Sequence, residues 1–229
     1  MREIVLDTET TGLDPFDGHR VVEIGALELH NHLPTGRTYH QYINPERDMP
    51  PEAFAVHGLS ETFLGDKPVF AEVVDDFLTF VDGAPMVIHN ASFDMKFINA
   101  ELKWAGKSAL PPEQAIDSLA LARKKHPMGP NSLDALCKRY NVDNAMRDLH
   151  GALLDSELLA QVYLELIGGR QQSLTLVDLK GGDEGENIQA TAVRSRRKPL
   201  APRLSEAELA AHGTMVASLG DAALWKKLS

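Results

Sequence analysis

The chain has 229 residues, of which 43% are hydrophobic and 24% charged, proportions typical of folded proteins with a sizeable core. A net charge of −10 and a single cysteine exclude a strongly basic nucleic-acid binder and a disulfide-built fold, and no run of about 18 apolar residues could span a membrane. We expect one domain with an appendage, in the cytoplasm, without a signal peptide or membrane association.

The first predicted element is a strand in residues 4–13 that carries two carboxylates. Asp7 and Glu9 are two residues apart, which places both on one face of the strand. Two like charges held so close repel each other unless a cation neutralises them, and carboxylate oxygens suit Mg²⁺ or Mn²⁺. The stretch therefore predicts a metal-binding strand; the alternative is an edge strand whose acids face water.

Two further strands, at residues 20–29 and 39–45, follow after short connections and indicate an antiparallel meander. A segment rich in turn residues comes next, at 50–60, and it contains Glu52 and His57. Polar side chains among proline and glycine more often belong to a surface loop than to a site.

The next elements are a helix at 68–81, a short buried strand at 86–90 and a helix that ends near residue 104, which Ser92 could cap. Asp94 thus lies just beyond the carboxyl end of a strand, where α/β sheets present ligands. On its own it could equally be a helix N-terminal charge stabilised by the macrodipole.

A strand at 114–117 and helices at 118–125, 132–140 and 151–167 complete the predicted body. Asp155 lies beside the apolar stripe of the last helix, and His150 stands just before it. Five residues along a continuous helix turn a side chain by about 140°, so a shared site requires His150 to lie on the non-helical approach. A histidine in such a place is otherwise usually a cap or a surface residue.

Four acids and a histidine, with no cysteine, suit a site that holds two cations by oxygen ligands and uses histidine as a base. At this point the sequence resembles a known family. Residues 7–12 (Asp-Thr-Glu-Thr-Thr-Gly), 89–94 (His-Asn-Ala-Ser-Phe-Asp) and 150–155 (His-Gly-Ala-Leu-Leu-Asp) are similar to the three motifs of the DEDDh 3′→5′ exonucleases. The resemblance also takes in residues 51–58 and 131–137 and covers residues 3–169.

The resemblance implies an α/β, ribonuclease-H-like fold with a mixed five-stranded sheet flanked by helices. It implies that four carboxylates hold two divalent cations, Mg²⁺ or Mn²⁺: Asp7, Glu9, Asp94 (partly through water) and Asp155. Substrate contacts are implied for Asp7, Glu9, Glu52, His57 and Asp155, with backbone groups near residues 10–13. His150 is implied as the general base that deprotonates the attacking water.

Charge is distributed unevenly between the body and the tail. Residues 1–170 contain 26 acidic and 15 basic side chains, whereas residues 171–229 contain 7 and 8. Because an acidic body does not attract DNA by its long-range field, bound metals and partner proteins must supply the affinity. We expect an exonuclease domain at 1–169, a flexible linker at 170–203 and a partner-binding tail at 204–229 that contains a helix capped by Ser205.

Two segments of the tail resemble docking peptides. Gln171, Leu174 and Leu176, within 171–176, are similar to the anchors of peptides that bind the sliding clamp. The segment 204–229 resembles the part of proofreading exonucleases that binds the catalytic (alpha) subunit of the polymerase. The resemblance leaves open whether an additional small accessory subunit binds the body.

The function implied is proofreading: hydrolysis of the 3′-terminal phosphodiester of DNA 3′ ends, which releases nucleoside 5′-monophosphates. Two alternatives stay open, an RNA-trimming exonuclease of the same family and a non-catalytic tether between polymerase and clamp. The complete set of four acids and a histidine argues against the tether.

Overall fold

The computed structural model describes residues 1–145, 149–169 and 205–219. Residues 1–169 include a folded body, and helix α8 (Glu206–Ser218) belongs to a separate unit. The predicted linker, its clamp peptide at 171–176 and the last ten residues lie outside the described residues. No helix in the described ranges has both the length and the apolar character needed to cross a bilayer.

A mixed five-stranded sheet in the order β3-β2-β1-β4-β5 forms the centre of the body. Its strands are β1 (Arg2–Thr10), β2 (Val21–His30), β3 (Leu33–Tyr42), β4 (Met86–Ile88) and β5 (Ala115–Asp117). The first three form an antiparallel meander, while β4 pairs in parallel with both β1 and β5. The predicted mixed sheet with a three-stranded antiparallel part is confirmed, and β1 is its central strand.

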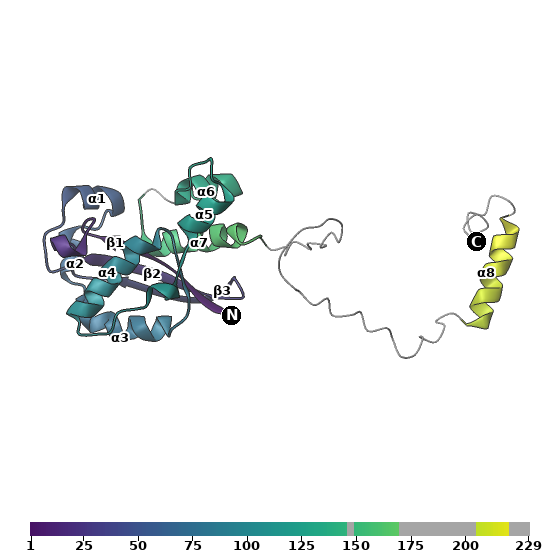
Figure 1. Ribbon diagram of the computed structural model, residues 1–229, viewed down its shortest axis with the longest axis horizontal. Coiled ribbons are helices and arrows are strands. Elements are labelled where there is room, and N and C mark those ends of the chain that lie inside the picture. Colours follow the sequence, from purple (N-terminus) through teal and green to yellow (C-terminus); the bar gives the residue numbers. More distant parts are fainter. Residues whose placement is uncertain (146–148, 170–204, 220–229) are drawn as a thin grey trace, which may run out of the picture. The chain divides into compact units, whose positions relative to one another are not determined.

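Two hydrophobic cores form because successive side chains of β1 point to opposite faces. Ile4 and Leu6 pack with helices α3 (Phe70–Val81) and α4 (Ala91–Trp104). Val5 packs on the other face with the helices α5 (Ser118–Lys125), α6 (Leu133–Tyr140) and α7 (Ala152–Leu166). Figure 1 shows the two groups of helices on opposite sides of the sheet. Because both faces are covered, β1 can carry side chains into a site only near its carboxyl end.

The segment expected to be rich in turns, residues 50–60, instead contains helix α1 (Pro51–His57), followed by α2 (Glu61–Gly65). Pro51 occupies the first helical turn, where its fixed φ favours the helix and its missing N–H costs nothing. Gly58 ends the helix with φ 72° and donates its N–H to the Phe54 carbonyl. The two residues read as turn signals are therefore the start and stop signals of a short helix.

Of the two helix caps predicted from the sequence, the one at Ser205 is confirmed and the one at Ser92 is not. Ser205 caps α8 and forms the predicted capping box with Glu208. Ser92 does not cap α4: the N-cap is Asn90, in the left-handed region at φ 69° and without a side-chain cap bond. The prediction for Ser92 is wrong because the helix begins at Ala91, two residues earlier than a Ser92 cap would place it.

Candidate functional site

The carboxyl end of β1 supplies the first two carboxylates of the site. Asp7 and Glu9 lie on the face of the sheet that α7 covers, opposite Gly25 and Glu23 of β2. The register shifts after Glu9, a bulge that ends the regular pairing there. Asp7 is half-buried and Glu9 is 8% exposed, so both charges are held with little access to water.

Asp155 reaches the same place from the first turn of α7 and is 3% exposed. A Cβ at Gly25 would lie 2.1 Å from the backbone carbon of Ala152, so only glycine lets the start of α7 approach β2 this closely. The buried Ser156 hydroxyl donates to the Gly25 carbonyl oxygen at 2.8 Å. Because Gly25 pairs with Asp7, this contact places Asp155 beside the two acids of β1.

His150 lies on the non-helical approach to α7, one residue before the N-cap Gly151, as a site shared with Asp155 requires. Its Nδ1 is 3.2 Å from Asp155 Oδ2, and its side chain is 46% exposed. One ligand atom from each of Glu9, His150 and Asp155 lies within 4.8 Å of the others. These three side chains could share one cation.

Asp94 comes from the first turn of α4, in the layer on the other side of the sheet. The Thr8 hydroxyl donates to Asp94 Oδ1 at 2.6 Å, and the carboxyl is 3% exposed. Burial raises the pKa of Asp94 to about 7, against the lowering by the Thr8 hydrogen bond, and the nearby Asp117 charge raises it further. A buried carboxyl of this kind takes up a proton or a cation readily near neutral pH.

One cavity of about 260 Å³ is lined by every side chain that the sequence proposes as a ligand or base: Asp7, Glu9, Asp94, His150 and Asp155. His89 and Asp134 line it too, although the sequence assigned them no role in binding. The His89 ring Nδ1 is 2.9 Å from the Ser118 hydroxyl, and Asp134 accepts from the Asn144 amide at 3.2 Å. The sequence signal that could have indicated Asp134 is the resemblance to the exonuclease family at residues 131–137, which contain it.

The donor set of this cavity fits divalent cations. Its carboxylates are hard oxygen ligands, and a cation would relieve their mutual repulsion. No thiol reaches the cavity, since Cys137 is buried in the hydrophobic core beneath α7. The family to which the three sequence motifs point uses divalent metal ions.

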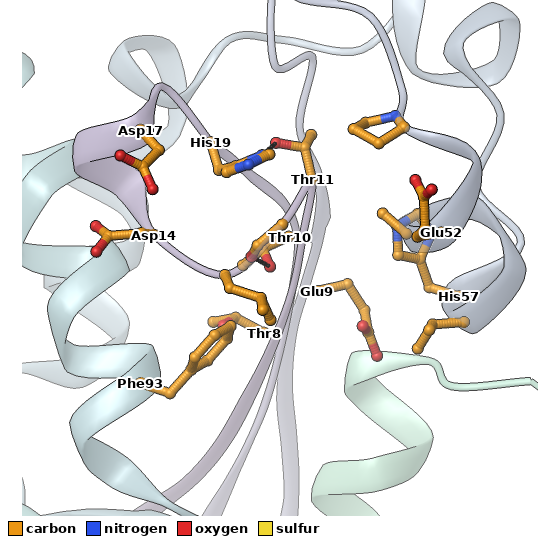
Figure 2. Close-up of a pocket in the computed structure, with 15 residues that line it drawn as sticks. Thr8, Glu9, Thr10, Thr11, Asp14, Asp17, His19, Glu52, His57 and Phe93 are labelled. Carbon is orange, nitrogen blue, oxygen red and sulfur yellow. Dashed lines mark hydrogen bonds between the residues drawn. The ribbon is translucent and has the colours of Figure 1, made fainter.

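A second cavity of about 590 Å³ adjoins the first and shares Thr8, Glu9 and Phe93 with it. In Figure 2, Glu52 and His57 of α1 stand on one side and Phe93 of α4 on the other, with β1 between them. Glu52 and His57 therefore lie beside the carboxylate cavity, and not in it. The turn after β1, residues 10–13, lines the same cavity.

His57 is 5% exposed, and its Nδ1 accepts a hydrogen bond from the Leu59 N–H at 3.0 Å. Burial lowers the pKa of His57 and the nearby His150 lowers it further, whereas the Thr10 backbone acts in the opposite direction. Because the pKa of His57 lies below its ordinary value, the ring is mainly neutral at pH 7.

Comparison with known proteins agrees with this geometry. The model of the exonuclease family RNase_T matches residues 4–163. The chain is 56% identical over 181 residues to the DNA polymerase III subunit epsilon of Rickettsia felis, which covers 78% of this chain and 79% of that protein. It is 44% identical to the Escherichia coli subunit epsilon over an alignment of 239 residues, with 98% and 97% covered.

A solved structure, Exonuclease X in complex with 5′ overhanging duplex DNA, has a TM-score of 0.56 and 25% identity, over 72% of this chain and 90% of that chain. This likeness agrees with the ribonuclease-H-like fold expected from the sequence. The chain therefore belongs to the RNase_T exonuclease family and, within it, to the epsilon subunits of DNA polymerase III, which are proofreading 3′→5′ exonucleases.

Proposed function

We propose that the carboxylate cavity holds two divalent cations, Mg²⁺ or Mn²⁺. Asp7, Glu9 and Asp155 would bind them directly, and Asp94 would bind partly through water. The convergence of these four acids and His150 on one cavity is the observation that carries the proposal. When bound, the cations supply the positive charge that stabilises the attacked phosphate and the leaving 3′ oxygen.

His150 would act as the general base. His150 Nδ1 is 3.2 Å from Asp155 Oδ2, and donation of its Nδ1–H to this oxygen would keep the imidazole in the tautomer in which Nε2 accepts a proton. The imidazole would take this proton from the water that attacks the phosphorus of the 3′-terminal phosphodiester in line. The bond from phosphorus to the 3′ oxygen of the preceding nucleotide breaks, this oxygen takes up a proton from solvent, and the terminal nucleotide leaves as a nucleoside 5′-monophosphate. The 46% exposure of the ring allows water to reach it and the proton to leave afterwards.

Glu52 and His57 would contact the terminal nucleotide in the larger cavity. Phe93 and the backbone of residues 10–13 would enclose its base and sugar. A mispaired end frays at a lower cost than a paired one, so a site that takes a single-stranded terminus favours mismatches. This difference in fraying is the physical basis of proofreading.

The protein is a 3′→5′ exonuclease and associates with DNA polymerase III, as its identity of 44–56% to epsilon subunits indicates. We propose that residues 204–229 bind the catalytic (alpha) subunit and that Gln171, Leu174 and Leu176 bind the sliding clamp. The division into an exonuclease domain at 1–169, a linker at 170–203 and a tail remains part of this proposal, as does a small accessory subunit on the body. Tethering would replace the weak attraction of an acidic body for DNA by a high effective concentration.

The test is release of mononucleotides from a primer with a mismatched 3′ end, with Mg²⁺ or Mn²⁺ and with a chelator, beside an RNA strand of the same sequence. We expect metal-dependent cleavage of DNA that His150→Ala abolishes and the control His30→Ala leaves intact. His30 is exposed and pairs with Arg2 at the opposite end of β1. A strong preference for RNA, or full activity of His150→Ala, would contradict the proposal.

A further inference from the structure

The short segment that carries His150 is attached to the end of helix α1 by two contacts. The His150 backbone N–H donates to the Val56 carbonyl oxygen at 3.1 Å. A Cβ at residue 58 would lie 2.6 Å from Leu149 Cδ1, so the leucine methyl occupies space that Gly58 leaves open. Two neighbouring residues of the segment thus rest on the last turn of α1 and on the glycine that ends it.

The same helix forms one wall of the larger cavity. Glu52, Val56 and His57 all line it, and His57 is close enough to His150 for the charge of one ring to lower the pKa of the other. Val56 connects the two features, because it lines the larger cavity and its carbonyl oxygen accepts the hydrogen bond from the His150 N–H. A shift of α1 on binding a nucleotide would therefore be passed directly to the segment at 149–150.

We propose that Gly58 and Leu149 are positioning residues that fix the imidazole of His150 to the helix that contacts the terminal nucleotide. Occupation of the larger cavity then sets the position of the base over the carboxylate cavity. The inference rests on the proposed role of His150. It adds that the base is held from α1 as well as from Asp155, which is 3.2 Å from its ring.

The physical reason is that proton transfer is sensitive to position. A displacement of about 1 Å can cost roughly a hundredfold in rate even when binding is unchanged. Leu149 is 51% exposed, so it contributes little to the core, and its truncation removes the contact with Gly58 without unfolding the body. A leucine so placed is suited to testing position apart from stability.

The test compares Leu149→Ala with Leu33→Ala, which removes a leucine that is 52% exposed on β3. We expect Leu149→Ala to lower kcat about tenfold on single-stranded DNA, with KM within about twofold, and Leu149→Met to restore most of the rate. Mn²⁺ affinity measured by calorimetry and the Tm should stay at the wild-type values, because no ligand and no core residue is altered.

A second readout does not depend on turnover. The imidazole resonance of His150 is identified in histidine-labelled protein by its loss in His150→Ala. On addition of thymidine 5′-monophosphate with Mg²⁺ it should shift in the wild type and in Leu33→Ala, and shift much less in Leu149→Ala. Gly58→Ala, which displaces Leu149 and strains a residue at φ 72°, should reproduce the effect.

Wild-type kcat and a wild-type nucleotide-induced shift in Leu149→Ala, while His150→Ala is inactive, would overturn this inference and leave the general base in place. Full activity of His150→Ala would instead overturn the role of His150 and the inference with it. A lowered Mn²⁺ affinity in Leu149→Ala would also count against positioning, since it would place the effect on the cation ligands.

Discussion

Asp94 and Asp155, each 3% exposed, are buried where a carboxylate charge is costly unless a hydrogen bond or an opposite charge compensates it. Their neighbours make the cost higher, because Asp7 and Glu9 line the same cavity. A protein does not retain four such acids for stability, since replacing them by neutral side chains would relieve the repulsion. At the residue scale the cavity is therefore strained in the absence of cations and relaxed in their presence.

Asp155→Asn should abolish nearly all exonuclease activity and leave the fold intact. Loss of one carboxylate ligand removes several kcal/mol of charge stabilisation, which corresponds to roughly a 10³-fold lower rate. With a chelator present, the Tm of Asp155→Asn should not be lower than that of the wild type, because the substitution removes one of the negative charges that repel each other in the cavity. The exposed Asp76 on α3 supplies the control, Asp76→Asn, for which rate and Tm should be unchanged. Substantial activity of Asp155→Asn in the assay of mononucleotide release would refute the ligand assignment.

His57 should make the body less stable as the pH falls. Burial lowers the pKa of its folded form below the ordinary value of 6.5, so in acid the unfolded chain binds the proton more readily than the folded one. The free energy of unfolding therefore decreases as the pH falls through 6.5 toward the folded pKa, and this part of the decrease should be missing in His57→Gln. Urea unfolding midpoints at pH 7.5 and 5.5 measure it, and equal differences between the two pH values in both proteins would contradict the prediction.

At the scale of elements, the close packing of α7 on β2 determines the geometry of the site. Gly25→Ala would drive a methyl group into the backbone at Ala152, so the first turn of α7 and Asp155 must move. We expect a loss of about 3 kcal/mol, which lowers the Tm by roughly 10 °C, together with a large loss of activity. Gly65→Ala is the control, because nothing lies within 4 Å of the added carbon. Calorimetry and the nuclease assay on both variants test this prediction. A wild-type Tm for Gly25→Ala would contradict it, because it would show that α7 can move away from β2 without loss of stability.

The sequence predicted the longer helices because their apolar periodicity is strong, as in residues 69–81, whose helix buries Val73, Phe77 and Phe80. The third strand was predicted at 39–45, whereas β3 spans Leu33–Tyr42, because the first six residues of β3 are exposed and have no apolar alternation.

The sequence did not predict α1. That helix has only seven residues, too few for an apolar repeat to be recognised, and it is flanked by proline and glycine, which are also typical of turns. The start of α4 was also misplaced. Its N-cap is Asn90, which adopts a left-handed conformation without a side-chain cap bond, whereas Ser92 is the residue type that usually caps a helix.

The candidate ligands and His150 could be proposed before their positions were known because the motifs at 7–12, 89–94 and 150–155 resemble those of a known family. Their convergence could not be predicted, since Asp7 and Asp155 are joined only by the approach of α7 to Gly25, a contact between residues far apart in sequence. Thr8 was not among the predicted site residues, and its side chain points to the face opposite Asp7 and Glu9. Its hydrogen bond to Asp94 needs the parallel pairing of β1 with β4.

For the molecule as a whole, the acidic body should act on DNA chiefly when it is tethered. A chain that ends at residue 169 should degrade single-stranded DNA with a kcat/KM within about twofold of the full chain and with the same Tm. It should lose co-elution with the polymerase catalytic subunit and the clamp, and with it the acceleration that an effective concentration provides. Gel filtration of mixtures and the assay with and without partners test this. Equal binding of both partners by the shortened chain would contradict the role proposed for the tail.

The position of α7 at the end of the body determines when the site becomes complete during synthesis. Asp7, Glu9 and Asp94 are synthesised before His150, which directly precedes α7, and before Asp155, which lies in α7, the last helix of the body. A nascent chain, or one cut short before residue 150, has three of the acids but neither the base nor the fourth acid. Such a fragment cannot hydrolyse DNA by this site, so the nuclease becomes active only when its body is complete.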